Sequence, residues 1–141
     1  MKRLASAAFA FCLSGLCFLT SLQAQTDKAV TGADVYSACQ LAVRITNAPT
    51  NLTDLEWGKA SHCMGYLNGM RDMQAIWNTV NDSYNRKEYS IMCIPPEATV
   101  FELTKVVLKY LDEHPTFLHS PGSMAVMMAF EDTYPCVKKT P

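Results

Sequence analysis

The sequence has few histidines, no basic cluster and no metal-binding motif. No run of Lys or Arg exceeds two residues, which argues against nucleic acid or an anionic membrane surface as the partner. The three histidines stand at no ligand spacing with a cysteine, and neither Cys-x-x-Cys nor His-Glu-x-x-His occurs. We therefore assign no catalytic residue, no metal and no cofactor, and an enzyme is disfavoured.

Internal repeats, low-complexity tracts and strand-like alternation are also missing. With 141 residues the chain is long enough for one compact domain and too short for two. Its apolar residues recur instead at the three- and four-residue spacing of helices. The sequence therefore predicts an all-α domain, a compact bundle of about four helices.

The first 24 residues have the pattern of a secretory signal peptide. Lys2 and Arg3 precede an apolar run over residues 4–19, and Ala24 precedes the expected cleavage before Gln25. The run is too short, and wrongly flanked, for a transmembrane helix. The mature protein is thus expected to be exported, without a membrane anchor. Loss of two basic residues from 12 leaves 10 against 13 acidic ones, a net charge of −3.

The rest of the chain divides into a flexible leader (25–31), a helical domain (32–136) and a polar tail (137–141). Four helices are predicted in the domain, separated by Asn- and Pro-containing breaks: 32–46, 53–80, 99–113 and 122–133. Thr53 with Glu56, and Thr99 with Glu102, have the spacing of capping boxes that open the second and third helices. Ser120 is expected to cap the fourth.

The apolar stripe of the second helix is predicted to face the core throughout its length. It consists of Cys63, Tyr66, Leu67, Met70, Met73, Trp77 and Val80. Met92, Met124, Met127 and Met128 also fall on apolar segments, which favours core filling over a flexible, client-binding methionine surface.

Four cysteines remain after signal removal, an even number that indicates two disulfides in an oxidising compartment. If the first two helices pack antiparallel, Cys39 and Cys63 come level. Cys93 precedes the third helix and Cys136 follows the fourth, so a second antiparallel pair brings these together. The favoured connectivity is Cys39–Cys63 and Cys93–Cys136.

Gly65 and Gly69 lie four residues apart inside the second helix, where each costs about 1 kcal/mol relative to Ala. Close packing of another helix is the favoured reason, and a binding surface is the alternative. The polar loop over 81–90 carries Tyr84, Arg86 and Tyr89, residue types that are frequent in recognition surfaces. These three are the candidate partner-binding residues, with a plain solvated loop as the alternative.

Several motifs occur in a familiar order along the chain. They are Cys63-Met-Gly-Tyr-Leu-Asn-Gly-Met-Arg-Asp72, Cys93-Ile-Pro95, Val106-Val-Leu-Lys-Tyr-Leu111 with His114-Pro115, and Tyr134-Pro-Cys136. In this the chain resembles the Rap/Tai family of immunity proteins, which protect bacteria with type VI secretion from their own peptidoglycan amidase effectors. The resemblance implies an all-helical, disulfide-bonded protein of the Gram-negative periplasm that often forms a homodimer.

The function implied by this resemblance is steric inhibition of a secreted amidase by covering its active-site cleft. The matching residues define a fold more than an inhibitory surface, and function resides in surfaces. A small periplasmic chaperone or stress-type binding protein is the alternative, and the methionines are its support.

Overall fold

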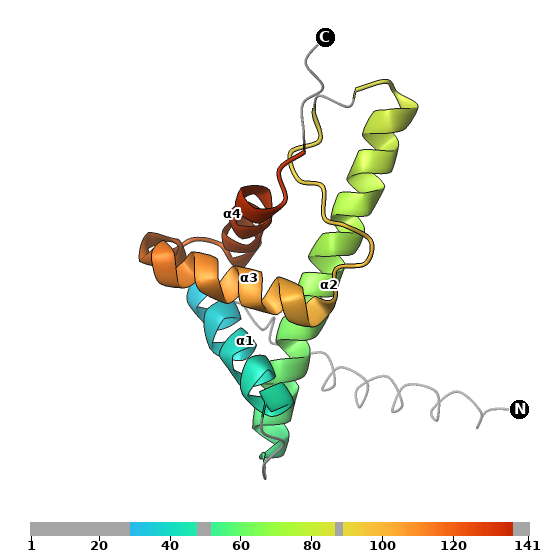
Figure 1. Ribbon diagram of the computed structural model, residues 1–141. Helices are drawn as coiled ribbons and strands as arrows, with labels where there is room; N and C mark the ends of the chain where they lie inside the picture. The colour runs from blue at the N-terminus through green and yellow to red at the C-terminus, as the bar shows by residue number, and fades with distance from the viewer. Residues whose placement is uncertain (1–28, 48–51, 87–88, 137–141) are drawn as a thin grey trace, which may run out of the picture.

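The computed structural model describes residues 29–47, 52–86 and 89–136 and confirms the all-α fold over them (Figure 1). The expected signal peptide and tail lie outside the described residues. The elements in chain order are α1 (Gly32–Asn47), α2 (Asp54–Ser83), α3 (Val100–Glu113), the 3-10 helix η3 (Pro115–His119) and α4 (Gly122–Thr133). The sequence did not predict η3, and α2 continues past residue 80, to Ser83.

Both predicted capping boxes are present. Thr53 Oγ1 accepts a hydrogen bond from the Glu56 backbone N–H, and the Glu56 carboxylate accepts one from the Thr53 N–H, at 3.3 and 3.0 Å. Thr99 and Glu102 repeat this exchange at the start of α3. The cap expected at Ser120 is wrong, because the N-cap of α4 is Pro121, which has no side-chain donor or acceptor.

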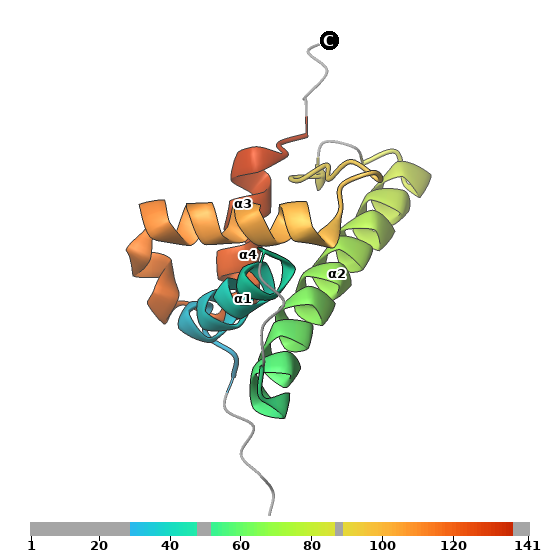
Figure 2. The ribbon, with the colours of Figure 1, turned by 60° about the horizontal axis from the view of Figure 1, so that its bottom comes forward.

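The longest helix, α2, runs along one edge of the described structure. The helices α1, α3 and α4 all lie on the same side of α2 (Figures 1 and 2). Thirty residues at 1.5 Å each give α2 a length of about 45 Å. Its first half packs on the other helices, and its second half extends beyond them, accompanied by the coil that leads to α3 (Figure 1). The core holds one side chain or more from every α-helix, among them Val35, Leu67, Leu103 and Phe130.

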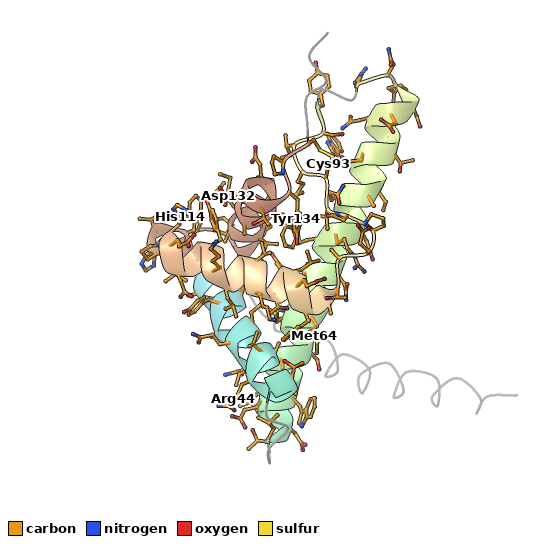
Figure 3. All side chains as sticks on the ribbon, in the orientation of Figure 1. Arg44, Met64, Cys93, His114, Asp132 and Tyr134 are labelled. Atoms are coloured by element: carbon orange, nitrogen blue, oxygen red, sulfur yellow. A yellow bond between two sulfur atoms is a disulfide. The ribbon has the colours of Figure 1, made fainter. Side chains whose placement is uncertain are left out.

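Two disulfides join these elements, with the predicted connectivity. Cys39–Cys63 links α1 to α2 inside the core, where both residues are fully buried. Cys93–Cys136 ties the coil before α3 to the end of α4, and Cys93 lies beside the second half of α2 (Figure 3). The second bridge is nearer the surface, since Cys93 is exposed.

The starts of α1 and α4 are held together by reciprocal backbone hydrogen bonds. The Gly32 N–H donates to Ser120 O at 2.9 Å, and the Gly122 N–H donates to Val30 O at 2.8 Å. A Cβ on Gly32 would lie 2.2 Å from Phe117 O. The start of α1 can therefore approach η3 this closely only because residue 32 is glycine. Val30 is half-buried against the core. Val30, at the end of the predicted leader, therefore packs against the helical domain.

The predicted apolar stripe of α2 is wrong in its second half. Met73, Trp77 and Val80 are exposed, whereas Gln74 and Asn81, one residue further along, are buried. The inner face here meets coil instead of helix, and coil carbonyls need hydrogen-bond donors. Two are supplied from α2: Asn78 Nδ2 donates to Met92 O at 3.2 Å, and Arg71 Nη1 donates to Ala98 O at 3.0 Å. The polar side of α2 thus faces inward and its apolar side faces outward.

Candidate partner-binding surface

The end of α2 presents a group of exposed aromatic and apolar side chains, which we call the tip: Trp77, Tyr84, Arg86, Tyr89 and Ile91. Tyr84, Tyr89 and Trp77 are 69%, 58% and 55% exposed. Arg86 is exposed as well, and its guanidinium carbon lies 5.5 Å from the centre of the Tyr84 ring. Arg86 therefore makes a cation–π contact with Tyr84 at the exposed end of α2.

The chain turns at the tip through a left-handed residue. Asn85 has φ 54°, a conformation that Asn tolerates better than other side chains with a Cβ. The Asn85 N–H donates to Asp82 O, and the Arg86 N–H donates to Asn81 O at 2.7 Å. This pair of hydrogen bonds is the Schellman motif, which ends a helix with a left-handed residue just beyond its last turn. It sets the course of the backbone from Tyr84 to Arg86.

Beyond the turn, the returning chain is fastened to α2 and to the end of α4. The Trp77 Nε1–H donates to Tyr89 O at 3.5 Å, a long hydrogen bond. Further on, the Cys93 N–H donates to Tyr134 O at 2.8 Å beside the Cys93–Cys136 bridge. Burial, with a smaller contribution from the Glu102 carboxylate, raises the pKa of Tyr134. The chain that leaves the tip is therefore attached both to α2 and to the end of α4.

The structure places all three predicted partner-binding residues in this exposed group. It also adds Trp77, which sequence reasoning had assigned to the core stripe of α2, and Ile91, which follows the predicted polar loop. The signal that could have found Trp77 is the polar row of Gln74, Asn78 and Asn81, which has the spacing of one helix face.

The packing role predicted for Gly65 and Gly69 is wrong within this chain. No described atom outside the local helix backbone lies within 4 Å of a Cβ built on either residue, and the same holds for Gly58. The described part of the fold therefore gains no close contact from glycine at these positions, although each costs helix stability. The alternative, a binding surface, is the one that fits the exposed position of Gly65 and Gly69 on α2.

Two kinds of site are absent from the described residues. Among them, no three His, Cys, Asp or Glu side chains lie close enough together to hold a metal ion. In the same ranges, no helix is both long and apolar enough to cross a membrane. The acidic side chains with lowered pKa values are the helix-capping Glu56 and Glu102, each stabilised chiefly by the backbone N–H of its N-cap threonine.

Comparison with known protein families gives one match. The family of Rap1a immunity proteins matches residues 31–136. The chain belongs to the Rap1a immunity protein family. No curated protein and no solved structure matches the chain.

The Rap1a match spans all five helical elements and both disulfides. It begins at the residue that precedes α1 and ends at Cys136, so it coincides with the helical domain. The tip lies inside the matched range as well. Family membership therefore accounts for the scaffold, and the exposed surfaces of this Rap1a protein are where a partner would be recognised.

Proposed function

We propose that this Rap1a protein is a periplasmic immunity protein that binds and sterically inhibits a peptidoglycan amidase delivered by type VI secretion. The observation that carries the proposal is the family match over residues 31–136. Inhibition needs no chemistry from the inhibitor, because covering the catalytic cleft of the amidase excludes its substrate. The secretory signal predicted for residues 1–24 and the two disulfides fit an oxidising periplasm.

The tip is the surface that we propose meets the toxin. Tyr, Trp and Arg dominate the energetics of protein interfaces, and the tip presents all three types. Its aromatic rings have only two rotatable side-chain bonds and so lose little conformational entropy on binding. Anchoring by α2 and by Cys93–Cys136 lowers the ordering cost further, which favours affinity.

We further propose that the inhibitor acts as a homodimer. The support is the apolar side-chain surface that α2 leaves exposed outside the tip, at Met73, Ile76 and Val80. Monomeric proteins seldom expose a large contiguous apolar patch without using it.

A chaperone-type function has less support, because only part of its methionine surface is exposed. Met73 and Met124 are exposed, but Met92, Met127 and Met128 are half-buried. Two separated exposed methionines do not make the continuous flexible surface that promiscuous binding requires.

Titration calorimetry with a Cys/His amidase encoded beside this protein tests the function. The variant is the triple substitution Tyr84→Ala, Arg86→Ala and Tyr89→Ala. If these side chains are central to the interface, the free energy of binding weakens by about 4 kcal/mol, roughly 1,000-fold in Kd. The circular dichroism spectrum and Tm should stay close to those of the wild type, since all three side chains are exposed.

The matched control is Leu55→Ala with Trp57→Ala, which removes two exposed large side chains from the opposite end of α2. This control should bind the amidase with wild-type affinity. Full inhibition by the triple variant would move the interface away from the tip. Failure of the wild-type protein to bind the neighbouring amidase would contradict the proposed function itself.

A further inference from the structure

The two disulfides of this chain differ in whether a thiol in solution can reach them. Cys39 and Cys63 are 0% and 1% exposed, so the bridge between them, the core bridge, lies inside the packed interior. Cys93 is exposed and Cys136 is half-buried, so the bridge between them, the surface bridge, borders solvent. Exchange begins when a thiolate attacks one sulfur of a disulfide, and its rate depends on access to that sulfur. A reductant can therefore open the surface bridge in the folded protein, whereas the core bridge reacts only after unfolding.

The surface bridge is the covalent attachment of the chain that returns from the tip. Along this chain, Tyr89 lies four residues and Ile91 two residues before Cys93, and both are exposed members of the tip. The residue after Cys93, Ile94, is buried in the core. The other half of the bridge, Cys136, follows the end of α4. The bridge therefore lies where the returning chain passes from the exposed tip into the core.

Hydrogen bonds also hold the returning chain beside the surface bridge. The Cys93 N–H donates to Tyr134 O at 2.8 Å, and Met92 forms an isolated antiparallel bridge with Pro135. From α2, Asn78 Nδ2 donates to Met92 O at 3.2 Å and lies 3.9 Å from Cys93 Sγ. Water can replace hydrogen bonds of a segment near the surface at little net cost in free energy. The segment therefore gains conformational freedom when the surface bridge opens.

Conformational freedom of this segment lowers the affinity of the tip. A surface that is ordered before binding loses less entropy than one that its partner has to order. With the surface bridge closed, Tyr89 and Ile91 are held between the end of α2 and the anchored Cys93. With the bridge open, they belong to a longer segment that runs from Ser83 to the core residue Ile94. The core bridge and the packed interior do not take part in this change, so the helices are kept.

We propose that the surface bridge is a redox-sensitive switch of the tip: a dithiol reductant opens it in the folded protein, and the open form keeps its helices but binds the toxin more weakly. The inference rests on the proposed function and adds the regulation of its binding surface. A dithiol oxidant closes the bridge by the reverse reaction. The switch thus links full affinity for the toxin to an oxidising compartment.

The opening reaction is an exchange in two steps. A thiolate of the reductant attacks Cys93 Sγ, the S–S bond breaks, and the Cys136 sulfur leaves with the electron pair and takes up a proton. The second thiol of the reductant, as the thiolate, then attacks the mixed disulfide and releases Cys93, which takes up a proton in turn. The surface bridge is thereby reduced by two electrons to two thiols, and the reductant is oxidised to a disulfide.

Native reduction followed by alkylation tests whether the two bridges differ. The oxidised protein is treated with dithiothreitol without denaturant, samples are quenched with iodoacetamide, and the alkylated cysteines are identified by peptide mass spectrometry. Cys93 and Cys136 should be alkylated first. The initial rate at the core bridge should be at least about 1,000-fold lower, because that bridge reacts through unfolded molecules, about one in 1,000 or fewer. Equal initial rates at the two bridges would overturn the proposal.

Hydrogen exchange tests the effect on the returning chain without any amidase. One open form is prepared by native reduction and alkylation, and the variant Cys93→Ser with Cys136→Ser provides an open form without the added groups. In both, the backbone N–H of residue 93 should exchange at least about 10-fold faster than in the oxidised protein, since the segment around it opens locally. The helical circular dichroism signal should be kept. Unchanged exchange at residue 93, or loss of the helical signal, would overturn the proposal.

Titration calorimetry with the neighbouring amidase then tests the regulation. Dithiothreitol, at a concentration that opens the surface bridge and leaves the core bridge closed, should weaken binding by the wild type at least about 10-fold. The matched control is the variant Cys93→Ser with Cys136→Ser, which should bind equally weakly with and without dithiothreitol. This control excludes an effect of the reductant on the amidase.

The contrary results of the calorimetry are distinguishable. Unchanged affinity of the wild type after opening would overturn the switch and leave the immunity function standing. An oxidised wild type that does not bind the amidase would contradict the proposed function itself.

Discussion

Removal of the Cys39–Cys63 disulfide should destabilise this protein more than removal of Cys93–Cys136, although it closes the shorter loop. With sequence separations of 24 and 43 residues, loop entropy alone gives about 3.4 and 4 kcal/mol. The native state reverses this order. Cys39 and Cys63 are fully buried, so replacing both with Ala also leaves cavities that cost about 1 kcal/mol each. The expected losses are therefore about 5 kcal/mol for the core bridge and about 4 for the other.

Urea unfolding under non-reducing conditions measures the difference. Each bridge is removed as a double Cys→Ala variant, and both variants are measured at the same protein concentration. The free energy of unfolding comes from the midpoint and the m-value. If the core variant is unfolded in water, as a 5 kcal/mol loss can cause, titration with a stabilising osmolyte recovers the comparison. A larger loss for the Cys93, Cys136 variant would refute the reasoning, since unfolded-state entropy would then outweigh native packing.

Two further outcomes follow from glycine and carboxylate positions. Gly58→Ala should raise the free energy of unfolding by about 1 kcal/mol, because the new Cβ meets open space. Gly32→Ala should lower the free energy of unfolding by about 1–3 kcal/mol, because the new Cβ would collide with Phe117 O. Thermal melting of both variants should therefore show shifts in Tm of opposite sign. Folding lowers the pKa values of Glu56 and Glu102 from 4.5. The two carboxylates therefore stabilise the folded protein above that pH, and this stabilisation is lost as the pH falls through their folded pKa values. A variant with both Glu56→Gln and Glu102→Gln keeps the capping-box spacing without the charge. Its Tm should fall less than the Tm of the wild type between about pH 5 and pH 3. Equal decreases in Tm would contradict a role for these carboxylates.

Local signals in the sequence were sufficient for the four α-helices, although not for η3 or for the cap of α4. The capping boxes at Thr53 and Thr99 fixed two helix starts, because a cap needs only residues three apart. The pairing of Cys39 with Cys63 followed from the antiparallel return of the chain after a short break. The candidate partner-binding residues Tyr84, Arg86 and Tyr89 were predicted to be exposed because a polar segment cannot form a core.

Only the tertiary structure decided which face of α2 is buried and which face is exposed. Periodicity shows that a helix has an apolar side, but it does not show what covers that side. The coil before α3 covers the inner face of the second half of α2 and takes hydrogen bonds from Asn78 and Arg71, which excludes the apolar side from the interior. Hence the sequence by itself determined four α-helices, two disulfides and the exposure of Tyr84, Arg86 and Tyr89. The three-dimensional packing decided that Gly65, Gly69 and Ile76 are surface residues, because burial depends on neighbours that are distant along the chain.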